Sequence, residues 1–220
     1  MVYRCPPVSE SVKTQKRTRR AEKARATHDR IVEAATRLFL ERGYVQTTID
    51  AVAEAGDVAV ETVYARFRNK TNLMIAVKEA AVTEHGEVPL DRRPELDALA
   101  AEPDQRRQLK IAAGLSRGML ERISPVYAVL RNAAAADDGL REHLAADIAV
   151  RRNFQQTIVK LIRAQRPLRR GLSVAQAAET YSALANPDVY LLLTIHHGWS
   201  ADRYQTWLAD SLASLLLAPL

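Results

Sequence analysis

The sequence predicts an all-α protein, and three observations support this. Apolar residues recur at the i, i+3, i+4 and i+7 spacing of a helix over most of the chain, and no stretch alternates as a strand does. Only 8 glycines and 9 prolines interrupt the 220 residues. The apolar fraction, 47%, is enough for a buried core and excludes a fully disordered chain. With no apolar run of about 18 residues and no secretory signal in the first thirty, we expect a cytoplasmic location.

The excess positive charge lies at the N-terminus. Residues 1–26 contain eight basic and two acidic side chains, whereas residues 27–220 contain equal numbers of each. A segment of this composition repels itself, and a polyanion neutralises it because each phosphate contact releases counterions. We therefore expect residues 1–26 to form a disordered basic arm, which is either a solvated tail or a nucleic-acid contact.

Residues 27–76 predict a compact set of short helices. A first helix over 27–42 ends at Gly43, and a second, capped by Thr47 or Thr48, runs to residue 55. Gly56 and Asp57 form a tight break, because both residue types tolerate positive φ. A third helix follows over 59–67. A fourth, capped by Thr71 or Asn72, leads out of the cluster.

Residues 77–220 predict a larger helical domain. Gly86 and three prolines make residues 86–104 a loop or a broken helix, and long helical patterns follow. One helix ends at Ser124-Pro125, another stops near Pro167, and Pro187 starts or kinks a later one. Ser173 and Ser200 are positioned to cap the remaining helices.

A two-turn helix, a break and a second short helix form the layout of a helix-turn-helix, in which the second helix enters the major groove of DNA. Six positions of the 59–67 helix lie off its buried stripe: Val60, Glu61, Thr62, Tyr64, Ala65 and Arg66. Val60 is suited to a thymine methyl, Glu61 to a cytosine amino group, and Thr62 to a base or a phosphate. Glu61 faces a polyanion, so it either reads cytosine or pairs with Arg66 or another neighbour.

Phosphate contacts are expected from Tyr64, Arg66 and Lys70, which would fix the register of the protein on the duplex. Thr48, at a helix N-terminus, can present its hydroxyl and backbone N–H groups to a phosphate. Taken singly, each of these residues is better explained by an ordinary surface or capping role.

Residues 27–76 resemble the DNA-binding domain of the TetR family of bacterial repressors. The resemblance is carried by Ile31, Ala34-Ala35, Leu38-Phe39, Glu41-Arg42-Gly43-Tyr44, Thr47-Thr48-Ile49, Val52-Ala53, Val58, Thr62-Val63-Tyr64, Phe67, Asn69-Lys70 and Leu73. It departs from the family at Gly56-Asp57 and at Glu61. The resemblance implies a homodimer that binds a palindromic double-stranded operator and releases it when a small molecule binds the C-terminal domain. It also suggests that Arg19, Arg20 and Lys23 reach an adjacent minor groove or flanking phosphates.

The effector site is expected between helices of residues 77–220, among apolar and aromatic side chains with a few polar groups. The candidates are Met119, Tyr127, Arg131, Arg151 and Phe154, although a place in the plain core is the better explanation for most of them. The last helices, which carry Tyr181, Tyr190, Trp207 and many leucines, are expected to form an isologous four-helix dimer interface.

Two other classes of function compete with a ligand-responsive repressor. A nucleoid-organising or scaffold protein would use the same DNA-binding module without an effector, and an enzyme would need an acid/base pair in its pocket. The sequence contains no nucleophile elbow, phosphate loop or paired-carboxylate signature. Cys5 is the single cysteine, and His196-His197 lacks the i, i+4 spacing of a zinc pair. We therefore expect no cofactor and no metal.

Overall fold

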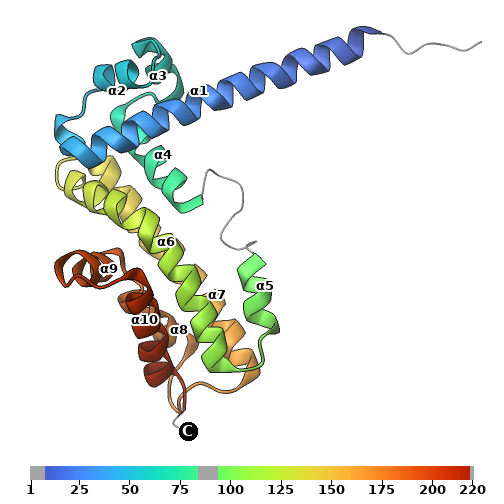
Figure 1. The fold of residues 1–220 in the computed structure, drawn as a ribbon, viewed down its shortest axis with the longest axis vertical. Coiled ribbons are helices and arrows are strands. Elements are labelled where there is room, and N and C mark those ends of the chain that lie inside the picture. Colours follow the sequence, from blue (N-terminus) through green and yellow to red (C-terminus); the bar gives the residue numbers. More distant parts are fainter. Residues whose placement is uncertain (1–7, 84–93, 219–220) are drawn as a thin grey trace, which may run out of the picture.

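The computed structural model describes residues 8–83 and 94–218, and every regular element in these ranges is helical (Figure 1), as predicted. The N-terminal part consists of α1 (Val8–Gln46), α2 (Ile49–Ala55), α3 (Val60–Phe67) and α4 (Lys70–Thr83). The larger part consists of α5 (Pro94–Ala101), α6 (Gln105–Ala133), α7 (Asp138–Gln165), α8 (Val174–Leu184), α9 (Pro187–Leu191), the π-helical turn η2 (Leu192–His196) and α10 (Ala201–Leu216).

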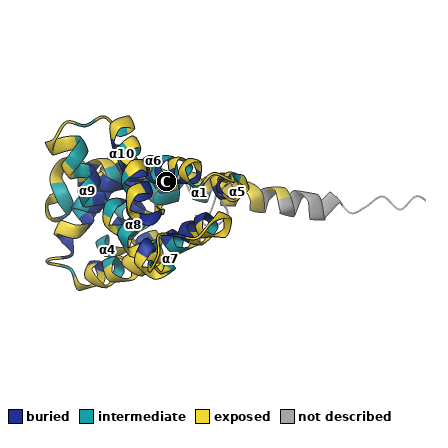
Figure 2. Ribbon diagram, turned by 90° about the horizontal axis from the view of Figure 1, so that it is seen from below, coloured by how far each residue is buried: buried dark blue, intermediate teal, exposed yellow. Residues whose placement is uncertain are grey.

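The N-terminal arm differs from the sequence prediction, because residues 8–26 are the first part of α1 and not a disordered segment. Strong helix formers fill this stretch, and no glycine or proline occurs between Val8 and Arg42. An i, i+4 ion pair between Arg25 and Asp29 (4.0 Å) lies on this helix. Figures 1 and 2 show that the first part of α1 projects away from the rest of the protein. Residues 1–7 of the predicted arm lie outside the described residues.

Gly43 interrupts α1 where the sequence predicts a helix end. Its φ of 76° and ψ of 171° belong to a region that only glycine adopts without strain, and the chain kinks there. At the predicted break after α2, Asp57 takes the positive φ of 49° instead of Gly56. Gly56 is buried, and a Cβ there would lie 3.2 Å from the Val52 carbonyl oxygen. Gly56 is therefore needed for the close approach of neighbouring backbone atoms and not for a positive φ.

Two further boundaries differ from prediction. Pro125 does not end a helix, because α6 continues through it from Gln105 to Ala133. Proline removes the hydrogen bond to the carbonyl of Glu121, but both residues are exposed, so water can satisfy that group. At the start of α4, Asn69 accepts from the Asn72 backbone N–H (2.8 Å), in place of the predicted caps Thr71 and Asn72. The predicted caps Thr48, Ser173 and Ser200 all accept from the backbone as expected.

The core has two clusters that meet along α6 and α7. The smaller cluster packs α1, α2, α3 and α4 against Val126, Leu130 and Leu140 at adjacent ends of α6 and α7. The larger cluster packs α5, α8, α9 and α10 around the rest of α6 and α7. The predicted domain boundary between residues 76 and 77 falls inside α4, which continues to Thr83. A single helix therefore connects the two predicted domains.

Gly43→Ala should lower the free energy of unfolding by about 1–3 kcal/mol, because alanine in this backbone conformation is strained. No heavy atom lies within 4 Å of a Cβ built at Gly43, so a steric clash would not contribute. Urea unfolding monitored by circular dichroism measures the change. Gly118→Ala is the control: a Cβ inside α6 would lie 3.8 Å from the nearest side-chain atom, that of Arg122. It should raise stability by about 0.5–1 kcal/mol, and equal effects of the two substitutions would contradict the assignment.

Candidate nucleic-acid interface

The helix α3 is held by a few apolar contacts and leaves one side free. Val63 and Phe67 are its buried residues, and the His28 ring of α1 lies 5.1 Å from the Phe67 ring, centroid to centroid. The preceding α2 is positioned by Thr47, whose buried hydroxyl donates to the Gly43 carbonyl oxygen (2.8 Å). Thr48 caps α2 by accepting from the Ala51 backbone N–H (3.1 Å). The geometry is therefore that of a helix-turn-helix built on α1.

The residues of α3 predicted to contact DNA are all at least partly exposed, although Val60 also packs against the smaller core cluster. Glu61 and Arg66 are exposed, Val60 and Thr62 are half-buried, and half of the Tyr64 surface is open to solvent. Within the part of the chain that the structure describes, no ion pair joins Glu61 to Arg66 or to any other cation. Glu61 is therefore available to accept a hydrogen bond from outside the protein.

Lys70 has contacts inside the protein that the sequence did not predict. Its Nζ donates to the Val45 carbonyl oxygen (3.3 Å) and lies 4.3 Å from the centroid of the Tyr44 ring. Partial burial lowers the pKa of Lys70, and the nearby Asp137 carboxylate opposes this shift. An ammonium group has three donors, so Lys70 can keep its contact with Val45 and still donate to a phosphate.

Asp137 joins the helix-turn-helix to the larger domain, and sequence reasoning missed it. Its Oδ2 accepts from the Tyr44 hydroxyl (2.8 Å) and the Thr71 hydroxyl (2.7 Å), and its Oδ1 accepts from the Leu140 backbone N–H (3.0 Å). Burial acts to raise the pKa of Asp137, but these hydrogen bonds outweigh it and the pKa is lowered. Burial raises the pKa of Tyr44 to about 12. The three partners come from α1, α4 and the N-terminus of α7.

A buried ion pair forms a second connection between α4 and α7. Lys78 of α4 pairs with Asp147 of α7, and both residues are buried. His143, one turn earlier on α7, has its pKa lowered by burial and by the positive charge of Lys78. Two sets of interactions are together called the α4–α7 contacts. They are the hydrogen bonds of Asp137 with the Tyr44 and Thr71 hydroxyls and the Lys78–Asp147 ion pair. Breaking either one would leave a polar group partly or fully buried without its partner.

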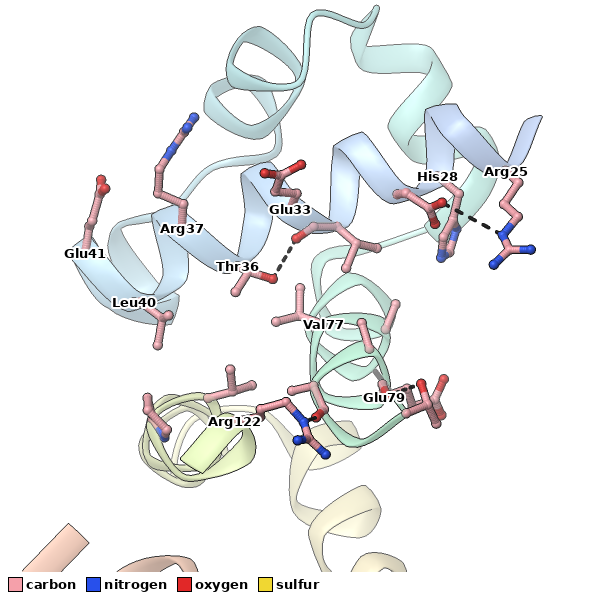
Figure 3. Close-up of a pocket in the computed structure, with 18 residues that line it drawn as sticks. Arg25, His28, Glu33, Thr36, Arg37, Leu40, Glu41, Val77, Glu79 and Arg122 are labelled. Atoms are coloured by element: carbon pink, nitrogen blue, oxygen red, sulfur yellow. Dashed lines mark hydrogen bonds and ion pairs between the residues drawn. The ribbon is translucent and has the colours of Figure 1, made fainter. Parts of the chain in front are cut away.

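A groove of about 1490 Å³ lies between α1, α4 and α6 (Figure 3). Val77 on α4 lies at its base, and Glu33, Arg37 and Arg122 are among the polar side chains that line it. None of the five predicted effector residues lines this groove.

Those five residues lie in α6 and α7. Tyr127 is buried, and Met119 and Phe154 pack against the larger core. Arg131 is exposed and forms an ion pair with Asp188 of α9. Arg151 donates from Nη2 to the Tyr127 hydroxyl (3.2 Å).

The last helices leave apolar side chains uncovered. Leu192 and Ile195 of η2 are 48% and 70% exposed, and Leu215 of α10 is 43% exposed. Trp199 packs edge-on against Trp207, with centroids 6.0 Å apart.

The residues that the structure describes contain no cluster of three or more potential metal ligands, and no helix among them has the length and hydropathy needed to cross a bilayer.

Comparisons with known proteins agree with this geometry. Residues 31–77 match the model of bacterial regulatory proteins of the tetR family. The HTH-type transcriptional regulator TcmR of Streptomyces glaucescens is 32% identical over 106 residues, which are 47% of this chain and 42% of TcmR. The aligned part therefore spans less than half of that relative.

Two solved structures share the fold over most of the chain. A putative TetR-family regulator from Rhodococcus sp. is 18% identical with a TM-score of 0.66, covering 86% of this chain and 98% of its own. FadR from Bacillus subtilis, in complex with stearoyl-CoA, is 17% identical with a TM-score of 0.67, covering 84% of this chain and 97% of its own.

Asp137→Ala should lower the free energy of unfolding by about 1–3 kcal/mol, because α7 loses its N-cap and two hydroxyls lose their acceptor. Urea unfolding at pH 7 measures the loss. Asp138→Ala is the control, because Asp138 is exposed and pairs with Arg141 on the surface; its cost should stay below about 0.5 kcal/mol. Since the folded-state pKa of Asp137 is lowered, its contribution is present above about pH 4 and is lost as the pH falls through that pKa. The difference between wild type and Asp137→Ala should therefore shrink in acid; a constant difference would contradict the role of the carboxylate.

Proposed function

We propose that this chain, whose residues 31–77 match the model of bacterial regulatory proteins of the tetR family, is a dimeric transcriptional repressor that binds a palindromic operator and releases it on binding a small molecule. The observation that carries the proposal is the free side of α3, with Glu61, Tyr64 and Arg66 exposed and Val60 and Thr62 half-buried on a helix of the right size for a major groove.

Dimerisation follows from the reach of α3. One helix of eight residues contacts too few bases for a specific site, whereas two copies about 34 Å apart contact successive major grooves. We propose that the exposed Leu192, Ile195 and Leu215 form part of the isologous interface, since apolar side chains of this size on a surface favour burial against a partner.

The helical arm adds a second DNA contact. Arg19, Arg20 and Lys23 are exposed on α1, N-terminal to the part of this helix that packs against α3. We propose that they bind phosphates or the minor groove beside the operator half-site.

Release by an effector requires that the larger domain act on α3. The α4–α7 contacts provide the physical path, because a shift of α7 moves Asp137 and Asp147 and thereby α4, which follows α3 after a short turn. FadR from Bacillus subtilis, which shares this fold, is solved in complex with stearoyl-CoA, and this supports a small-molecule ligand for this chain. A DNA-organising protein without an effector is the alternative function, and it would bind many sites with no ligand-dependent release.

Selection from random DNA duplexes followed by sequencing should recover one palindromic site and so tests the proposal. In that assay Tyr64→Ala should weaken binding to all sequences alike, whereas Glu61→Gln should change which base is preferred at one position of each half-site by about 1–3 kcal/mol. Glu142→Gln, which removes an exposed carboxylate from α7, is the matched control and should alter neither property. An unchanged base preference in Glu61→Gln would contradict the readout assignment.

Replacing Arg19, Arg20 and Lys23 by alanine should reduce the salt dependence of operator binding. Each lost phosphate contact lowers the slope of log K against log salt by about 0.9, so three contacts predict a change of about 2 to 3. Alanine preserves helix propensity. The control removes three exposed cations from α7 (Arg152, Lys160 and Arg163). Equal slopes for the arm variant and the control would show that the arm does not bind DNA.

A further inference from the structure

Polar side chains with unpartnered buried atoms occur on both α6 and α7, which are joined by the hydrogen bond from Arg151 to the Tyr127 hydroxyl. Ser124 is fully buried, Gln155 is 6% exposed, and Arg151 is half-buried. Three of their side-chain atoms are buried and have no hydrogen-bond partner: Ser124 Oγ, Gln155 Oε1 and Arg151 Nε. A buried polar atom without a partner costs about 1–3 kcal/mol, so a further molecule that supplies partners to these atoms would be bound favourably.

Within the described ranges Arg151 also has no counter-ion. Its guanidinium carbon lies 5.1 Å from the centroid of the Tyr127 ring, and its Nη2 donates to the Tyr127 hydroxyl. Among the described residues no carboxylate lies within ion-pair distance of Arg151, and Asp147, one turn earlier on α7, is paired with Lys78. By contrast, Arg131 and Arg141 are more exposed and both have acidic partners. A cation that is partly buried and unpaired favours an anion as its ligand.

The neighbours of these side chains define the rest of the ligand. Arg151 and Gln155 lie at i and i+4 on α7, and Ser124 and Tyr127 lie at i and i+3 on α6, so each pair shares one face of its helix. Phe154, beside them on α7, is partly buried and packs against the larger core, as Met119 of α6 does. Together these side chains offer one cation, hydroxyl and amide groups, and an apolar surface.

We propose that Arg151, with the Tyr127 hydroxyl, binds the carboxylate of an amphiphilic organic acid, whose apolar body packs on Met119 and Phe154. Ser124 and Gln155 complete the polar side of the site. This inference rests on the proposed function, because the acid is then the effector whose binding moves α7. The competing explanation is that Arg151 stacks on Tyr127 only to stabilise the fold. In that case the site would show no preference for an anion.

Matched acids and alcohols test the charge requirement. Isothermal titration calorimetry on the full-length protein compares octanoate with octan-1-ol, and 2-naphthoate with 2-naphthalenemethanol. For at least one pair, we expect the acid to bind about tenfold more tightly than its alcohol. Arg151→Met retains an unbranched apolar side chain and should reduce the acid to the affinity of the alcohol, while the alcohol is unaffected. Arg152→Met, at the exposed neighbouring position, is the control and should behave as the wild type.

The proposal is overturned if neither acid binds more tightly than its alcohol, or if Arg151→Met keeps the preference for the acid. Should Arg151→Met fail to fold, Tyr127→Phe removes only the hydroxyl that Arg151 contacts; it should weaken acid binding several-fold, and an unchanged acid affinity would equally overturn the site. Operator binding is measured separately on the same samples. Selective DNA binding without an acid preference contradicts this inference alone, whereas an acid preference without selective DNA binding contradicts the proposed function.

Discussion

The shared core at the junction of the helix-turn-helix and α6–α7 is the constraint on which the structure depends. Helices of seven and eight residues, such as α2 and α3, are too short to be stable alone. They are held because their apolar residues pack on α1 and α4, and because the same cluster continues into α6 and α7. The orientation of α3 is therefore set by the larger domain as well as by its own turn.

Polar contacts at this junction fix how α4 is placed against α7. Hydrophobic packing alone would allow α4 to slide along α7, since apolar contacts have little direction. The hydroxyls of Tyr44 and Thr71 meet one oxygen of Asp137, and Lys78 meets Asp147 further along the same helix. Two directional contacts at separate points determine both the position and the rotation of α4.

The helix α7 connects this junction with Arg151 in the larger domain. Asp147 and Arg151 are one turn apart, so the side chain that contacts α4 and the unpaired cation belong to the same rigid segment. A ligand that draws Arg151 toward itself would therefore act on Asp147 without any intervening element. That proximity gives the proposed effector response a short mechanical path.

The sequence by itself determined the helical class, the helix-turn-helix and the caps at Thr48, Ser173 and Ser200, because these depend on the local spacing of apolar residues and on neighbouring hydrogen bonds. It misjudged the arm and Pro125, where helix propensity and solvent exposure outweighed charge repulsion and the proline signal. It gave no sign that Tyr44 and Thr71 meet Asp137, 93 and 66 residues away in the chain. Such contacts join distant segments, and only the packing of α4 against α7 decided them.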